Sequence, residues 1–292
     1  MARRLAGIGI SSPGPVDPRI GVVVEPPNLG PRFHDIPLAA EMEAGLALPA
    51  YLDRDTNVAI LGEREFGAAR GVDDVVYLTI STGVGGAIVS GGRLLHGPDG
   101  MAGELGHLPV ALDGPRCGCG GIGHLEAFAS GVALARDARA AAADGASPWL
   151  SARLAEVGIE GLSARDVAAG DDAGDDVCRA LMMRARRAVA VACVGIANAF
   201  NPHLIVIGGS IADGQGARLL DPVRAALDSE VFAALGRRVR VAPAALGPDV
   251  SLAGAQPLVS SRLGDDAWRG ARPPVAPSTP RAASKPQEVA IS

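Results

Sequence analysis

Residues 101–131 read MAGELGHLPVALDGPRCGCGGIGHLEAFASG and carry the densest group of chemically specialised side chains in the chain. Within them stand His107, Cys117, Cys119 and His124, whose imidazole nitrogens and thiolate sulfurs are preferred zinc ligands. Glycines fill most of the gaps around the cysteines, so the backbone can turn tightly around a small ion. Four ligands of this kind within 18 residues predict a closed tetrahedral zinc site of the structural type.

A segment without metal is the alternative interpretation. Cys-x-Cys is a weak pattern by itself, and both thiols could stay free in a glycine-rich turn. A disulfide between Cys117 and Cys119 would close a strained ring, which argues against it. The chain has five His and four Cys, and two of each fall in this segment, which favours the metal. Four protein ligands would leave no open position for a catalytic water, which disfavours a zinc hydrolase.

The composition is typical of a globular protein, because the 292 residues are 48% apolar and 20% charged. The net charge of -5 supplies no basic surface for nucleic acid or an anionic membrane. No apolar run approaches the roughly 20 residues that span a bilayer, and the first residues lead into a strand rather than a secretory signal. Cys178 and Cys193 lie in helical sequence and are expected to be reduced thiols. These features predict a cytoplasmic protein.

Strands and helices alternate along the chain, which predicts an α/β fold. The expected strands are 5–11, 21–25, 50–52, 74–80, 87–89, 204–207 and 238–242. The expected helices are 38–46, 58–66, 125–143, 175–199, 217–235 and 252–263, and residues 145–174 are expected to be loop and short helix. Residues 270–292 are rich in Pro, Ala and Ser with nothing to bury, so we expect a disordered tail.

Acidic and amide side chains follow the third expected strand. Residues 53–57 read Asp-Arg-Asp-Thr-Asn, directly before a helix. In α/β folds such side chains project into the crevice beyond the carboxyl ends of the strands, so Asp55 is a candidate general base. Equally, Asp55, Thr56 or Asn57 could serve only as the N-cap of the helix.

Two glycine-rich turns follow buried strands. The first is Thr82-Gly83-Val84-Gly85-Gly86 and the second is Gly208-Gly209. Successive backbone N–H groups in such turns can cradle a phosphate. An ordinary glycine hairpin explains the first turn as well, and no Gly-Lys-Ser/Thr follows it, so it is not a Walker A loop.

Taken in order, these motifs resemble the ROK family of repressors and sugar kinases. The most specific part of the resemblance is Gly103-Glu-Leu-Gly-His107, Cys117-Gly-Cys-Gly and Leu125-Glu126-Ala. The resemblance implies a two-domain, actin-like ATPase (ribonuclease H-like) fold. It also implies ATP-dependent phosphorylation of a hexose or N-acetylhexosamine with Mg²⁺, and a homo-oligomer. It places residues 1–72 and a returning helix at 250–268 in a small N-terminal domain, and residues 73–249, with the zinc motif, in a large C-terminal domain.

The resemblance also assigns roles to individual residues. Asp55 is implied to be the catalytic base. The residues assigned to the sugar pocket are Gly14, Asn28, Arg54, Asn57, Glu104, His107 and Glu126. His107 is implied to bind zinc through one ring nitrogen and to face the sugar with the other. Thr82, Gly83, Val84, Gly85 and Gly86 match a phosphate loop, and Gly208 and Gly209 match the adenosine segment.

The chain departs from the family pattern at three places. His124 stands where the family has a fourth Cys ligand, and Arg54 stands where it has an Asn that touches the sugar. The family's first phosphate loop, Asp-x-Gly-Gly-Thr, occurs nowhere in the 292 residues. We therefore expect a truncated N-terminal domain with an unpaired strand edge, and a nucleotide site lacking one phosphate clamp and an Asp that organises Mg²⁺.

Two explanations for the missing loop stay open at this point. A start codon assigned too far downstream would leave the true protein a complete kinase, and the retained Asp55, Glu104, His107 and Glu126 favour this explanation. A truncated paralogue would instead be inactive. In that case the chain would be a non-catalytic sugar-binding protein, or a regulator without a DNA-binding arm.

Overall fold

The structure is a computed structural model that describes residues 5–25, 30, 33–235, 238–265 and 268. Asn28 and the expected tail at 270–292 lie outside the described residues. Within the described ranges, no helix is both long and apolar enough to cross a membrane.

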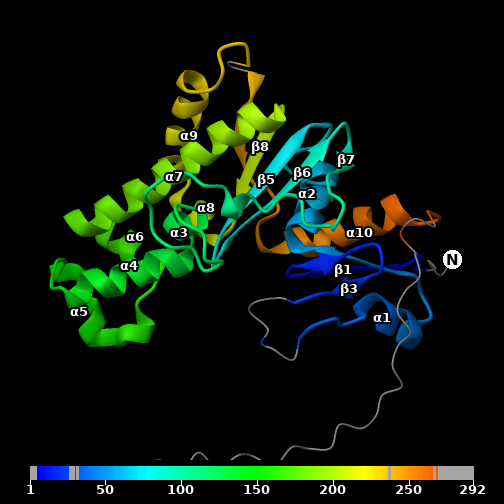
Figure 1. The fold of residues 1–292 in the computed structure, drawn as a ribbon, viewed down its shortest axis with the longest axis horizontal. Coiled ribbons are helices and arrows are strands. Elements are labelled where there is room, and N and C mark those ends of the chain that lie inside the picture. The colour runs from blue at the N-terminus through cyan, green and yellow to red at the C-terminus, as the bar shows by residue number, and fades with distance from the viewer. Residues whose placement is uncertain (1–4, 26–29, 31–32, 236–237, 266–267, 269–292) are drawn as a thin grey trace, which may run out of the picture.

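A five-stranded mixed sheet forms the larger layer (Figure 1). Its order is β7-β6-β5-β8-β9, with bounds β5 Val75–Ile80, β6 Val84–Ser90, β7 Arg93–Leu94, β8 Leu204–Gly208 and β9 Arg240–Pro243. Strands β5, β8 and β9 run parallel, while β6 is antiparallel to β5 and to β7. Gly91 and Gly92 join β6 to β7 with φ of 54° and 77°, the left-handed backbone that a tight hairpin requires and that glycine adopts readily.

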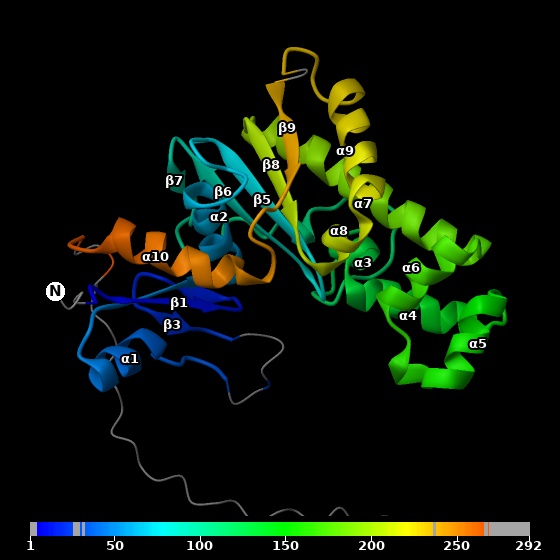
Figure 2. The same cartoon turned by 180° about the vertical axis from the view of Figure 1, so that it is seen from behind.

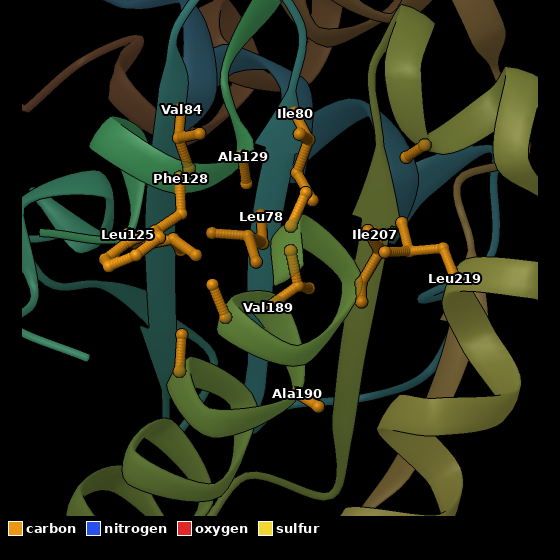
Figure 3. Close-up of a cluster of buried hydrophobic side chains, with 14 of the residues drawn as sticks. Leu78, Ile80, Val84, Leu125, Phe128, Ala129, Val189, Ala190, Ile207 and Leu219 are labelled. Atoms are coloured by element: carbon orange, nitrogen blue, oxygen red, sulfur yellow. The ribbon is translucent and has the colours of Figure 1, made fainter. Parts of the chain in front are cut away.

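Helices cover both faces of this sheet, because its strands are apolar on both sides. Leu78 and Ile80 point toward α3 (Glu126–Ala129) and α7 (Asp176–Phe200), where they meet Leu125, Phe128 and Val189 (Figure 3). The alternate residues of β5, among them Tyr77, face α2 (Asp55–Glu65) on the opposite side. This period-two alternation buries both faces of β5 and sets its register.

A second, two-stranded parallel sheet lies on the other side of α2 (Figures 1 and 2). It pairs β1 (Ile8–Ser12) with β4 (Ala50–Arg54), and a short hairpin of β2 (Val16–Asp17) and β3 (Val22–Val23) follows β1. Helix α1 (Leu38–Leu46) covers one face, and α2 with α10 (Val250–Arg262) covers the other. The second edge of β1 has no strand partner among the described residues.

Two glycines let α10 lie close to its neighbours. A Cβ on Gly9 would lie 2.5 Å from the Ala255 carbonyl oxygen, and one on Gly254 would lie 1.9 Å from that of Val58. No side chain fits in either gap. Helix α10 therefore packs against both β1 and α2 at backbone distance, which fixes the start of α2 against the end of β4.

The other helices depart from the expected pattern in detail. The expected helix 125–143 is broken into α3 and α4 (Gly131–Ala143) by Ser130, whose hydroxyl caps α4 by accepting from Ala133 N at 3.1 Å. The stretch 145–174 is mostly helical, because Ser147 and a Ser163 capping box start α5 (Pro148–Val157) and α6 (Ala164–Ala173). Helices α8 (Ser210–Gln215) and α9 (Ala217–Ser229) occupy 210–229. The division into 1–72 with 250–268, and 73–249, stays a prediction.

Candidate functional site

The four expected metal ligands converge. One ligand atom from each of His107, Cys117, Cys119 and His124 lies within 4.8 Å of the others. Cys117 Sγ lies 3.7 Å from His107 Nδ1, and Cys119 Sγ lies 3.2 Å from His124 Nδ1. A tetrahedral zinc ion holds its sulfur and nitrogen ligands roughly 3.5 Å apart. The donor set and its spacing therefore fit a closed Cys₂His₂ zinc site.

The local backbone explains why these ligands meet. His107 ends a 3-10 turn (Leu105–His107), and the chain then loops out and returns through an isolated bridge between Pro109 and His124. Within the loop, Cys117 N donates to Gly121 O at 2.8 Å and Gly120 N donates to Cys117 O at 2.9 Å. We call this segment, residues 107–124, the zinc knot.

Two carboxylates border the zinc knot. His107 Nε2 lies 4.0 Å from Glu104 Oε2, so the ring turns Nδ1 to the ligand cluster and Nε2 away from it. Glu126, at the start of α3, accepts from Val84 N at 3.0 Å with one oxygen, and its other oxygen lies 3.6 Å from Cys117 Sγ. The knot is thus joined to the first residue of β6 through Glu126.

Asp55 is an exposed residue among buried ones. It is the first residue of α2, and its neighbours Asp53, Arg54, Thr56 and Asn57 are all buried. The N-cap position belongs to Arg54, without a side-chain cap bond, so the N-cap role considered for Asp55, Thr56 or Asn57 is wrong. The carboxylate is therefore free for another function, although Oδ1 accepts from Thr56 N at 2.7 Å.

The surroundings of Asp55 favour its protonated form. Partial removal from water raises the pKa of Asp55 above its ordinary value, and the nearby Glu104 carboxylate acts in the same direction. The Thr56 N–H and the Arg54 guanidinium oppose this rise without cancelling it. A carboxylate with a raised pKa is a stronger proton acceptor once ionised, which suits a general base.

Asp53 is a buried carboxylate with several hydrogen-bond and ion-pair partners, and the sequence analysis missed it. Its Oδ1 accepts from Arg54 N at 2.8 Å and from Asn57 Nδ2 at 2.7 Å. Its Oδ2 lies 2.8 Å from His96 Nε2 and pairs with Arg262 at the end of α10. Burial alone would raise the pKa of Asp53, but His96, Arg262 and Asn57 together hold it below its usual range. Asn57, expected in the sugar pocket, is completely buried, and its amide donates to Asp53.

A pocket of about 540 Å³ opens beside the first glycine turn. Its walls come from that turn, α4, α6, α7 and α8, and include Ser81, Thr82, Val132, Ser163 and Ile211. Within this wall Gly131 N donates to the Ser81 carbonyl at 2.8 Å, which joins the start of α4 to the turn. The pocket is therefore held between the β5–β6 hairpin and the helices beyond it.

The predicted nucleotide residues are placed unequally around this pocket. Thr82 lines it, whereas Gly208 and Gly209 lie just before the lining residue Ser210. Gly209 has φ of 95°, and a Cβ there would lie 2.6 Å from the Ile80 carbonyl, so only glycine lets β8 turn into α8 here. Gly85 has a close approach of its own, since its Cβ would lie 2.8 Å from Thr56 Cγ2. Gly85 lies in β6, so the expected turn Thr82–Gly86 is a bend at 81–83 that continues into the strand, and β6 abuts the first turn of α2 at Thr56, next to Asp55.

Known proteins resemble the chain over most of its length. The model of the ROK family matches residues 1–262. The glucokinase of Thermotoga maritima is 34% identical over 88% of this chain and 80% of its own length. A ROK family glucokinase from Streptomyces griseus, solved in complex with glucose and AMPPNP, is 32% identical with a TM-score of 0.71, over 87% of this chain and 81% of that one. The xylose repressor of Caldicellulosiruptor bescii is 29% identical over 79% of this chain and 56% of its own. The structural match identifies the α/β fold as the actin-like ATPase fold predicted from the sequence.

Proposed function

The chain belongs to the ROK family, and on this premise we propose that it is a sugar kinase that transfers the γ-phosphoryl group of ATP to a hexose or N-acetylhexosamine. The observation that carries the proposal is Asp55, the exposed carboxylate with a raised pKa at the start of α2. Glu104 lies near enough to act on the pKa of Asp55, and Gly85 lies against Thr56, the residue after Asp55. The similarity to glucokinases supports the same assignment.

The chemistry proposed for Asp55 is general base catalysis. The ionised carboxylate accepts the proton of the sugar hydroxyl as that oxygen attacks the γ-phosphorus, and ADP leaves. Little covalent work falls to the protein in phosphoryl transfer, so positioning and charge dominate the rate. Mg²⁺ enters with ATP as part of the substrate and neutralises phosphate charge. We assign the phosphates to the segment Thr82–Gly86, which enters β6. We assign the adenosine to the 540 Å³ pocket, whose lining includes Thr82.

The acceptor sugar is proposed to bind beside Asp55. Glu104 and Glu126 offer carboxylate oxygens to sugar hydroxyls, and His107 offers Nε2. We propose zinc as the ion held by His107, Cys117, Cys119 and His124. It would supply no step of the transfer; it would fix the tautomer and direction of the His107 ring.

The zinc assignment predicts about one equivalent of zinc in the purified protein. Cys117→Ser should lower this content to near zero, because one hard hydroxyl cannot replace a thiolate in a tetrahedral site. Cys193→Ser is the matched control, since Cys193 is buried in α7 far along the chain from the knot. Elemental analysis by mass spectrometry measures both, and a wild-type protein that is folded and free of zinc would contradict the assignment.

A coupled ADP-release assay over a panel of hexoses and N-acetylhexosamines tests the kinase itself. Val132→Trp should raise KM for ATP about tenfold while leaving the sugar KM unchanged, because an indole at the exposed start of α4 narrows the proposed adenosine pocket. Val157→Trp, at the end of α5, is the control outside the pocket. The absence of turnover with every sugar would overturn the proposal.

A non-catalytic sugar-binding protein is the second candidate, because ROK repressors also match the chain. Sugar binding measured by calorimetry, together with no binding of ATP or its analogues, would favour it. The retained Asp55 favours the kinase, since binding alone needs no base. A cytosolic location, predicted from the sequence, and a homo-oligomer, implied by the resemblance to the family, complete the proposal.

A further inference from the structure

Arg54 is a buried cation directly before the proposed base. It is the last residue of β4, and its side chain is only 5% exposed. A guanidinium taken out of water is tolerated only with charged or polar partners. Both kinds of partner come from the segment that follows β7. Arg54 Nη1 pairs with the Glu104 carboxylate, and Nη2 donates to the Ala102 carbonyl.

Two glycines form the groove in which the Arg54 side chain lies. A Cβ on Gly14 would lie 3.0 Å from Arg54 Cδ, and one on Gly103 would lie 3.1 Å from Nη2. Arg54 Nε is buried and has no hydrogen-bond partner in the described part of the chain. The Arg54 side chain therefore fills the space between Gly14 and Gly103. Gly14 and Glu104, both expected to line the sugar pocket, contact Arg54.

Glu104 is the group for which Arg54 and a sugar would compete. Its Oε1 is held by the guanidinium, and its Oε2 lies 4.0 Å from His107 Nε2. A sugar hydroxyl that donates to Glu104 Oε1 competes with the guanidinium, and displacing the arginine would leave a buried cation without its charged partner. Leaving such a cation unpaired costs more than the new hydrogen bond returns.

We propose that Arg54 determines acceptor specificity by withdrawing one oxygen of Glu104, Oε1, from the sugar. The pocket then favours a hexose that lacks a free hydroxyl at the position facing Oε1, such as a deoxy or substituted sugar. The inference rests on the proposed kinase function and narrows its substrate class. It concerns the competition for one carboxylate, so it can be tested by binding as well as by turnover.

The test pairs Arg54→Asn with glucose and its monodeoxy forms, with Kd measured by calorimetry and KM by ADP release. The short amide frees Glu104 without introducing a charge. We expect glucose to bind about tenfold more tightly to this variant, equivalent to about 1.4 kcal/mol. We also expect one deoxy sugar, which wild-type protein binds as well as glucose, to bind the variant about tenfold more weakly than glucose. Adding Glu104→Gln should remove both effects.

Arg187→Asn is the matched control, because Arg187 pairs with Glu230 on the exposed side of α7 and should change no sugar affinity. If thermal unfolding shows that Arg54→Asn is unstable, Arg54→Lys decides, since an ammonium cannot hold Glu104 and Ala102 O together and should give a smaller gain of the same sign. Unchanged glucose affinity and an unchanged deoxy-sugar pattern would overturn the inference, even if wild-type protein is a kinase. Tighter sugar binding without any turnover would uphold it and refute the kinase.

Discussion

Asp55→Asn is expected to lower kcat by roughly 10²- to 10⁴-fold, which is the usual contribution of a positioned general base. The amide keeps the size of the side chain and cannot accept the hydroxyl proton. Asp55 is exposed at the start of α2, and its carboxylate accepts a hydrogen bond from the Thr56 N–H. Folding should therefore be unaffected. The coupled assay at saturating sugar and ATP measures kcat, and calorimetry should find sugar affinity within about threefold of wild type.

The control for this variant is Asp172→Asn, which removes an exposed carboxylate that pairs with Arg218 at the surface. It should leave kcat unchanged, because exposed ion pairs contribute little. If Asp55→Asn retains wild-type kcat while Asp172→Asn also does, Asp55 is not the base. A loss of kcat accompanied by equal loss of sugar binding would indicate a positioning role instead.

The pH dependence of turnover offers a separate check on Asp55. The base acts in its ionised form, and partial burial raises its pKa above the ordinary value of about 3.9 for an aspartate. As pH falls through that raised pKa, the carboxylate takes up a proton and kcat/KM should decline. The acidic limb should therefore begin at higher pH than an unperturbed aspartate gives, and it should be missing from the residual activity of Asp55→Asn.

Elements with a strong local signal were predictable from the sequence. Short runs of mostly apolar residues predicted β5 and β8, and the helical period of Ala-rich segments predicted α7. The zinc knot was predictable because its four ligands lie within 18 residues. Asp55 was predicted as the base because polar residues that follow a strand and precede a helix are informative. Residues 145–174, expected to be loop and short helix, hold the ten-residue helices α5 and α6, which begin at serine caps that apolar periodicity does not reveal.

The parts that escaped prediction join residues far apart in the chain. Asp53 meets His96 across 43 positions and Arg262 across 209, and no local pattern links the three. The pairing of Arg54 with Glu104 is hidden in the same way, since it spans 50 positions. Asp53–His96 and Arg54–Glu104 each tie the end of β4 to the segment that follows β7, and Asp53–Arg262 ties it to α10. The sequence predicts Asp55 as the base and the four ligands of the knot, but the structure is needed to show which long-range contacts hold the end of β4 in place.

The pairing of Asp53 with Arg262 predicts a large stability loss for Asp53→Asn, about 3–5 kcal/mol in the free energy of unfolding. The substitution removes the negative charge from a carboxylate that is 1% exposed and leaves the Arg262 guanidinium, also buried, without its charged partner. Urea denaturation measures the change. Asp221→Asn is the control, because its pair with Arg224 is exposed and should contribute less than about 1 kcal/mol.

Acid should remove the same stabilisation from the wild-type protein. The pKa of Asp53 is lower in the folded than in the unfolded chain, so the unfolded chain takes up this proton first as pH falls. Its contribution is complete above the unfolded value of about 3.9 and is lost as pH falls through the lower folded value. Asp53→Asn should therefore show a flatter loss of stability below about pH 4.

A double variant that combines Asp53→Asn with Arg262→Gln should lose less stability than the two single variants combined, because removing both partners leaves neither charge unpaired. Strict additivity would show that Asp53 and Arg262 do not act as a pair, and the end of β4 would then be fixed by packing alone.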